Sequence, residues 1–172
     1  MRELFGSVWK TLTFAIVVGL GGLVGTVSAW AQTVQNQPLR KVSVTLGDTV
    51  VIASIAETDG ARLRGLLGRE TISEDQAMLL DFVNESNYAI HMQGMKFPID
   101  AIWIDAHGEI KFIYQSVQPN SGEVYPSMVP ARYCLETKAG LCRKYAVKIG
   151  QKVHFGPPTR EKAPDTGGKP AK

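Results

Sequence analysis

The sequence lacks the local motifs that identify the common nucleophile-, metal- and phosphate-dependent enzymes. It contains no G-x-S-x-G, no H-E-x-x-H and no phosphate-cradling glycine loop. Ser116, Ser121 and Ser127 lie in or beside a proline-rich loop that contains no histidine. Nucleophilic catalysis therefore finds little support, and we expect a non-catalytic module in preference to an enzyme.

The central part of the chain also lacks a charge imbalance. Residues 32–156 contain 13 Lys and Arg residues against 13 Asp and Glu residues, so the formal net charge of +3 at pH 7 comes from the two ends. A neutral domain gives no electrostatic reason to bind nucleic acid or an acidic membrane surface. We predict a small-molecule partner, no nucleic-acid partner and a monomeric chain.

The amino-terminal segment has the pattern of a secretory signal peptide. A basic start is followed by an uncharged stretch over residues 11–29, and Ala29 and Ala31 form an A-x-A site. We predict cleavage after Ala31 and export to the periplasm or the extracellular space. The alternative is an uncleaved segment that anchors the chain in the inner membrane, because about 18 apolar residues can span a bilayer.

The remainder of the chain divides into three parts. Residues 32–40 are predicted to form a linker, and residues 41–156 are long enough to form one domain with a hydrophobic core. Residues 157–172 contain no large apolar side chain, so they cannot bury enough surface to offset the entropy of ordering. We predict a disordered tail there.

Cysteine is scarce, with only Cys134 and Cys142 in the chain. The stretch CLETKAGLC has no C-x-x-C spacing, which argues against a redox-active pair. An even number of cysteines in an exported domain predicts a structural disulfide, which would contribute about 2–3 kcal/mol. Two separate buried thiols are the alternative.

Short apolar runs separated by turn residues are typical of β-structure. Gly47 and Asp48 separate two β-branched runs, which predicts a hairpin. Thr58 or Asp59 can begin a short helix that ends at Gly68. The pattern predicts a mainly β fold: a single antiparallel β-sandwich or barrel-like domain with two short helices. The predicted strands and second helix cover residues 42–46, 49–55, 77–83, 88–92, 101–104, 109–117, 131–137, 138–147 (helix) and 151–155.

Four blocks of the sequence resemble one family. RLRGLLGRETISEDQAMLLDF, MKFPIDAIWID, PARYCLETKAG and VKIGQKV occur in the order found in the family catalogued as domain of unknown function 192, across residues 42–155. The resemblance implies a compact β-sandwich or barrel-like domain with a short helix, in a family whose members are often exported and have no established activity. It covers Arg64, Gly65, Arg69, Asp100, Arg132 and Glu136, to which it assigns no role.

One block departs from the family pattern. The family usually has an aromatic residue followed by Trp-Met-Lys-Asn before the P-x-D segment. Here His91 stands in place of that Trp, and Gln93 and Gly94 replace Lys-Asn. A family-wide ligand site that used the Trp and the Lys would therefore lack both in this chain.

The same block raises the question of a copper site. His91, Met92 and Met95 supply the imidazole and thioether ligands that suit Cu(I), and a glycine between them lets the backbone fold. Adjacent residues on a strand point to opposite faces, however, and methionine is a common filler of hydrophobic cores. We favour packing and keep copper binding as the alternative; no other cofactor is predicted.

Charged residues within apolar strands are the stronger candidates for a site. Asp100 opens a buried strand, and Arg132 and Glu136 lie four residues apart on another, which places them on one face. We predict that Asp100, Arg132, Glu136, Tyr125 and His91 face a small polar or carbohydrate-like ligand. The alternative is a structural ion-pair network, because a buried carboxylate is costly unless it is paired.

A carboxylate-based hydrolase is the third hypothesis. Asp100, Asp105 and Glu136 could meet in space as a catalytic pair, but nothing in the sequence places them together. The sequence therefore favours an exported binding or accessory module. Copper binding and carboxylate-based hydrolysis remain the two alternatives.

Overall fold

A computed structural model of the chain describes residues 38–157. The predicted signal peptide, most of the predicted linker and nearly all of the predicted tail lie outside the described residues. Among residues 38–157, no helix is long and apolar enough to cross a membrane. The structure therefore bears on the predicted domain, residues 41–156.

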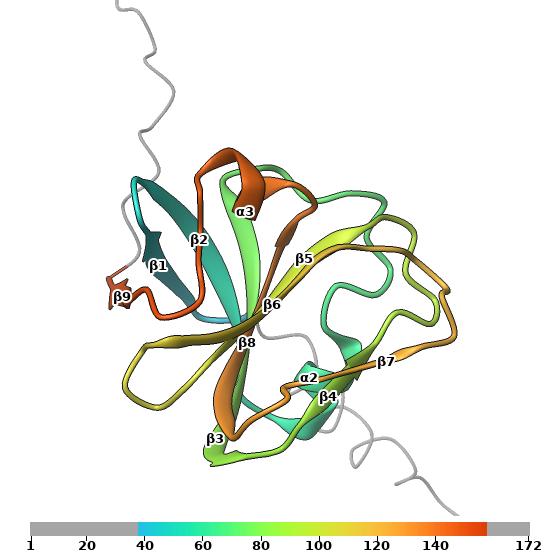
Figure 1. The fold of residues 1–172 in the computed structure, drawn as a ribbon. Helices are drawn as coiled ribbons and strands as arrows, with labels where there is room; N and C mark the ends of the chain where they lie inside the picture. The colour runs from blue at the N-terminus through green and yellow to red at the C-terminus, as the bar shows by residue number, and fades with distance from the viewer. Residues whose placement is uncertain (1–37, 158–172) are drawn as a thin grey trace, which may run out of the picture. The chain divides into compact units, whose positions relative to one another are not determined.

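The described chain is mainly β-structure, which confirms the prediction from apolar alternation. Nine strands and two short helices follow one another in residues 38–157 (Figure 1). The strands are β1 (Lys41–Leu46), β2 (Thr49–Ala56), β3 (Gln76–Ser86), β4 (Ala89–His91), β5 (Ile99–Ile104), β6 (Ile110–Val117), β7 (Val124–Pro126), β8 (Ala131–Lys138) and β9 (Val153–Gly156), and the helices are α2 (Asp59–Arg64) and α3 (Leu141–Lys144).

Seven strands form one curled sheet in the order β6-β5-β8-β3-β2-β1-β9. Its pairs are antiparallel except for β2 and β3, which are parallel because the chain crosses over through α2 between them. The Ile110 amide donates to the Gln151 carbonyl at 2.9 Å, which ties β6 to the segment before β9. The sheet is therefore a half-barrel. Strands β4 and β7 pair separately and are called the β4–β7 ribbon (Figure 1).

The central strands of the sheet are buried on both faces. Successive residues of β5 alternate between two hydrophobic clusters, with Ile102 in the first and Trp103 in the second. The first cluster includes Leu141 of α3, and the second includes Leu66, just after α2, and Ile90 of β4. The two faces of the half-barrel are therefore covered by different elements, and a side chain's position along a strand decides which face it reaches.

A tight turn before β6 supports the closure of the half-barrel. Gly108 has a φ of +78°, and a Cβ built on it would lie 2.9 Å from the Val153 carbonyl oxygen. Gly122 has a similar φ of +74° with nothing within 4 Å of its Cβ position. We expect Gly108→Ala to lower the free energy of unfolding by about 2 kcal/mol more than Gly122→Ala, because only the first adds a steric overlap to the cost of a positive φ. Equal losses in urea denaturation would contradict the steric contribution.

Candidate functional site

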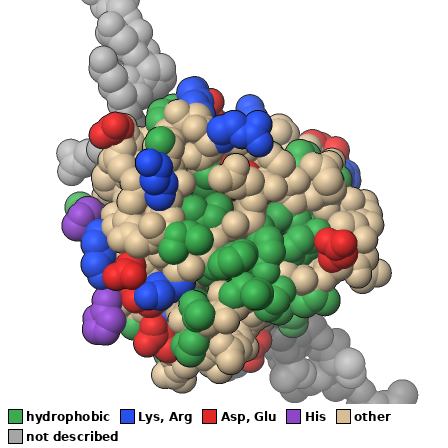
Figure 2. Space-filling model, in the orientation of Figure 1, with side chains coloured by type: hydrophobic (Ala, Val, Ile, Leu, Met, Phe, Trp, Pro, Cys, Tyr) green, Lys and Arg blue, Asp and Glu red, His purple; other side chains and the backbone are tan. Residues whose placement is uncertain are grey.

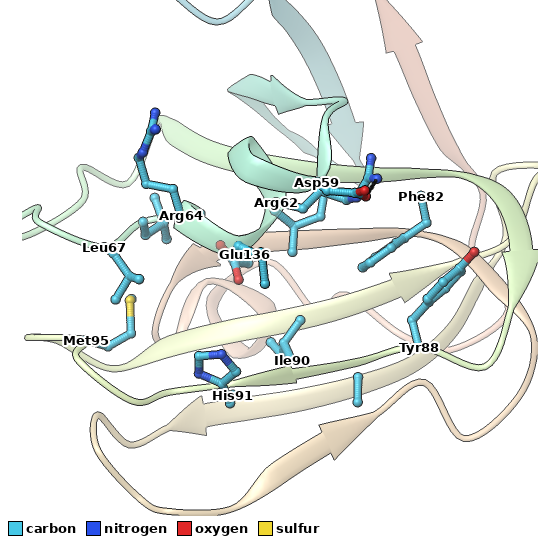
Figure 3. A pocket seen from close by; sticks show the side chains of 15 residues that line it. Asp59, Arg62, Arg64, Leu67, Phe82, Tyr88, Ile90, His91, Met95 and Glu136 are labelled. Carbon is cyan, nitrogen blue, oxygen red and sulfur yellow. Dashed lines mark hydrogen bonds and ion pairs between the residues drawn. The ribbon is translucent and has the colours of Figure 1, made fainter. Parts of the chain in front are cut away.

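A pocket of about 600 Å³ opens between α2 and β4. Its walls come from α2 and the residues that follow it, from the middle of β3, from β4 and the residues around it, and from one residue of β8 (Figure 3). The volume falls within the range of about 300–1,000 Å³ that small-molecule sites occupy. The aliphatic and thioether side chains of the lining are Leu63, Leu66, Leu67, Leu80, Ile90 and Met95.

Glu136 is the charged residue of this lining that is buried. It lies in β8 opposite Ala101 of β5 and Met78 of β3, and both of these neighbours belong to the second cluster. The residue is only 7% exposed, and its Oε2 atom has no hydrogen-bond partner among the described residues. Burial raises the pKa of the Glu136 carboxyl from 4.5 to about 7. The carboxyl therefore changes charge near neutral pH.

The end of α2 leaves open space next to that carboxyl. The Thr58 hydroxyl caps the helix by accepting a hydrogen bond from the Ala61 amide at 3.2 Å. The helix ends at Arg64 with Gly65 as its cap, earlier than the Gly68 that the sequence predicts. Gly65 has a φ of +45°, and a Cβ built on it would lie 3.4 Å from Oε2 of Glu136. A larger residue at this position would narrow the approach to the carboxylate.

Arg62 lines the same pocket, but its donors are already engaged. It donates to the carbonyl oxygens of Glu57 and Asp81, both at 2.6 Å, and it pairs with the Asp59 carboxylate. Its guanidinium also lies 5.6 Å from the centre of the Phe82 ring. Arg62 therefore serves the backbone and its own helix, and it leaves the pocket carboxylate without a partner.

An aromatic wall stands opposite the short helix. The rings of Phe82 and Tyr88 stack with centroids 4.0 Å apart and planes 12° from parallel, and Phe82 also stacks on Trp103 at 6.0 Å. Phe82 and Tyr88 both line the pocket (Figure 3). Sequence analysis missed both residues. They lie far from β8 in sequence, and no local pattern separates a pocket aromatic from a core aromatic.

His91 is the second predicted site residue that the pocket contains. It is exposed in β4, and Met95 also lines the pocket, whereas Met92 is buried in the second cluster and lies outside the lining. The three proposed copper ligands therefore do not face one space. Residues 38–157 contain no group of three or more His, Cys, Asp and Glu side chains placed to hold a metal ion.

Asp100 lies on the other face of the sheet. It pairs with Thr137 in the β5–β8 register, one position along from the Ala101–Glu136 pair, so the two carboxylates point to opposite sides. The Asp100 carboxylate is fully buried and accepts three backbone N–H bonds, from Ser116 at 2.8 Å, Gly140 at 3.1 Å and Cys142 at 2.9 Å. Its role in this structure is to brace the fold.

Arg132 and Asp105 are also engaged within the domain, and the pocket lining includes neither of them. Arg132 pairs with the Asp81 carboxylate at 3.2 Å. The Asp105 carboxylate accepts hydrogen bonds from the His107 and Glu109 amides in the turn before β6. The three carboxylates of the hydrolase hypothesis thus lie in three different settings.

Tyr125 belongs to an outer aromatic patch. Its ring meets Tyr114 edge-on at 5.2 Å, and Phe112 packs on Tyr114 at 4.8 Å. Figure 2 shows hydrophobic side chains gathered over the face of the molecule that it draws. The Tyr125 hydroxyl donates to Ser121 at 2.9 Å, and Tyr125 does not line the pocket. The structure brings together Glu136 and His91 and leaves the other three candidate ligand residues elsewhere.

The predicted disulfide is absent, which corrects the sequence-based prediction. Cys134 and Cys142 are both free and buried. Cys134 of β8 faces the second cluster and Cys142 of α3 belongs to the first, so the sheet separates the two thiols. Burial raises the pKa of both thiols, which keeps them protonated and unreactive at neutral pH.

Comparison with known proteins identifies a family and a shared fold. The family model DUF192, described as "Uncharacterized ACR", matches residues 42–155. A crystal structure from Sinorhizobium meliloti, described as a candidate transcription regulator, is 24% identical and has a TM-score of 0.63 over 67% of this chain and 92% of that chain. A protein of unknown function from Novosphingobium aromaticivorans is 22% identical, with a TM-score of 0.61 over 66% and 83%. A comparison with curated proteins finds no significant match.

Proposed function

The chain belongs to the DUF192 family, and from this premise we propose that its half-barrel is a binding module for a small ligand that enters the pocket between α2 and β4. The observation that carries the proposal is the Oε2 atom of Glu136, a buried acceptor with no partner among residues 38–157. Folded proteins satisfy nearly all their buried polar atoms, and an exception calls for an explanation. A bound ligand that donates to Oε2 supplies one.

The lining favours a ligand with an apolar body. Leucine, isoleucine and methionine side chains surround one buried carboxyl, which is the usual composition of a small-molecule site. A carbohydrate would bring many hydroxyl groups into contact with these apolar walls, and each unpaired hydroxyl would lose hydrogen bonds to water. A hydrocarbon body with one polar head matches the pocket better. We place this activity outside the cytoplasm, on the strength of the signal-peptide pattern in residues 1–31.

A neutral fluorescent dye tests the pocket. Leu63 lines it and is 72% exposed, so Leu63→Ser removes apolar surface from the pocket at little cost to folding. We expect Nile red to bind the unaltered domain with one-to-one stoichiometry, and Leu63→Ser to weaken binding about fivefold, which corresponds to about 1 kcal/mol of lost apolar contact.

The matched control removes an exposed apolar side chain elsewhere. Val50 of β2 is 49% exposed and lies outside the pocket, so Val50→Ser should leave the dye affinity unchanged. Fluorescence titration of the three proteins measures the effect. Equal affinities in all three, or no saturable dye binding at all, would show that the pocket is not the ligand site.

A further inference from the structure

The unpaired Glu136 carboxylate in the pocket indicates the kind of head group that the ligand carries. Building on the proposed function, we infer that the ligand is a cation with an apolar tail, an alkylammonium or a related amine. Its head group meets the Glu136 carboxylate at the base of the pocket, and its tail lies against the leucines of the α2 segment. Three features of the described residues support a cation in preference to a neutral or an anionic head.

First, no cation of residues 38–157 forms an ion pair with Glu136. Arg62, the partly buried cation of the lining, already pairs with Asp59 and donates to two backbone carbonyls. Arg64 is exposed, so water and salt screen its charge. Figure 3 shows the Arg64 side chain extending away from the Glu136 carboxylate. The interior therefore holds one carboxylate that residues 38–157 do not neutralise.

Second, the aromatic wall of the pocket already accommodates a cation. The Arg62 guanidinium lies 5.6 Å from the centre of the Phe82 ring, and Tyr88 extends the same aromatic stack. Aromatic faces attract ammonium and guanidinium groups, whereas they repel carboxylates. An anionic head would meet both this wall and the Glu136 carboxylate, so the pocket disfavours it.

Third, the folded protein has already removed the carboxyl from water. An ion pair usually gains little because both partners must lose their hydration. Here Glu136 is buried before any ligand arrives, so only the ligand's head group must be desolvated. Gly65 adds no side chain beside Oε2, where a Cβ would lie 3.4 Å from that atom, and a charge-assisted hydrogen bond is about twice as strong as a neutral one.

The affinity for a cationic ligand and the affinity for a neutral hydrogen-bond acceptor should change with pH in opposite directions. A cation needs the ionised carboxylate, so its affinity should rise as pH increases through the Glu136 pKa of about 7. A neutral acceptor needs the protonated carboxyl, so its affinity should fall over the same range. Other titratable or charged groups also face this site within residues 38–157. They are Asp59, Arg62 and Arg64 in α2, Tyr88 just before β4, His91 in β4 and Cys134 in β8.

The test compares three ligands that share one tail: octylammonium, 1-octanol and octanoate. We expect octylammonium to displace Nile red at pH 8 at a concentration at least tenfold lower than 1-octanol, and octanoate to be the weakest. Between pH 6 and pH 8 the ionised fraction of a group with a pKa of about 7 rises about tenfold. The affinity for octylammonium should rise by the same factor.

Two variants assign the effect to one side chain. Glu136→Gln keeps the shape of the side chain and removes its charge, so octylammonium should lose its advantage over 1-octanol while 1-octanol still binds. His91 lines the same pocket, and histidine is the side chain that ordinarily changes charge nearest neutral pH. In His91→Gln the pH dependence should persist. If that variant abolished it, His91 and not Glu136 would be the source, and the inference would fail.

The outcomes separate the two proposals. Equal affinities for octylammonium and 1-octanol in the unaltered domain would overturn the cationic head group and leave the pocket function standing. If none of the three ligands displaced the dye and the dye itself did not bind, the binding function would fail as well. Retained 1-octanol binding by Glu136→Gln shows that this variant is folded, and the pH dependence of the unaltered domain provides a test that needs no variant.

Discussion

Asp100→Ala should destabilise the domain by about 4 kcal/mol or more. The substitution removes the acceptor of three backbone N–H groups, those of Ser116, Gly140 and Cys142. Hydrogen bonds to a charged acceptor are each worth about 1.5–3 kcal/mol, and a buried donor left without a partner incurs the full cost of its lost hydration. Typical domains are stable by only about 5–15 kcal/mol, so the variant should lie close to unfolding at room temperature.

Urea denaturation with paired controls measures this effect. Asp100→Asn keeps one acceptor oxygen but places an amide group near at least one backbone donor. Its free energy of unfolding should therefore lie between those of the unaltered domain and the alanine variant. Glu70→Ala removes an exposed carboxylate that pairs with Lys96, and it should change stability by less than about 1 kcal/mol. A loss of under 1 kcal/mol for Asp100→Ala would rule out the bracing role.

Glu136→Gln should raise the free energy of unfolding, in contrast to Asp100→Ala, and the size of this gain should depend on pH. The carboxyl has a pKa of about 7 in the folded chain, against 4.5 ordinarily, so the folded state holds its proton more tightly than the unfolded state does. The unaltered domain therefore loses stability as pH rises from 4.5 to 7, where only the unfolded state releases the proton readily. One pKa unit corresponds to about 1.36 kcal/mol, so the shift costs about 3 kcal/mol above pH 7.

Glu136→Gln has no carboxyl at this position, so its stability should not show the loss between pH 4.5 and pH 7 that the Glu136 carboxyl causes. We expect its stability relative to the unaltered domain to improve by about 3 kcal/mol between pH 4 and pH 8, measured as the difference between two urea denaturation series. Glu70→Gln, at an exposed site, provides the control and should follow the unaltered domain. Parallel curves for Glu136→Gln and the unaltered domain would mean that the buried carboxyl has an ordinary pKa.

These two carboxylates explain why burial alone does not identify a site. Asp100 is fully buried, and the fold provides three donors for it. Glu136 is nearly as buried, but its Oε2 atom has no hydrogen-bond partner in residues 38–157, and the residue lines the pocket. A satisfied buried carboxylate stabilises the fold, whereas an unsatisfied one costs stability that a ligand can restore.

The local elements could be read from the sequence because they depend on neighbouring residues. The β-branched runs around Gly47 form the predicted hairpin of β1 and β2, and Thr58 caps the predicted helix. The length of that helix was overestimated. Leu63, Leu66 and Leu67 have helical spacing, yet the helix ends at Arg64 and Leu63 is 72% exposed. Spacing over so few residues does not decide where a helix ends, because the backbone of Gly65 can leave the helical conformation at low cost.

The candidate site could be predicted only in part, for reasons of strand register. Of the residues that the sequence grouped, Glu136 and His91 both line the pocket. Asp100, Arg132 and Tyr125 were grouped with them because each is polar or aromatic within a strand, but a sequence does not reveal which strands pair. The aromatic wall of Phe82 and Tyr88 was missed for the same reason.

By itself, the sequence determined the class of the fold, the family of the chain and the presence of buried acidic groups, because alternation, capping and turn residues act over a few positions. Only the tertiary structure decided which of the two buried acidic groups reaches the pocket. The β5–β8 register pairs Ala101 with Glu136 and Asp100 with Thr137, and the two acids belong to strands some thirty residues apart. Because side chains alternate across a strand with a period of two, a slip of one residue in that pairing would place both acids on the same face of the sheet.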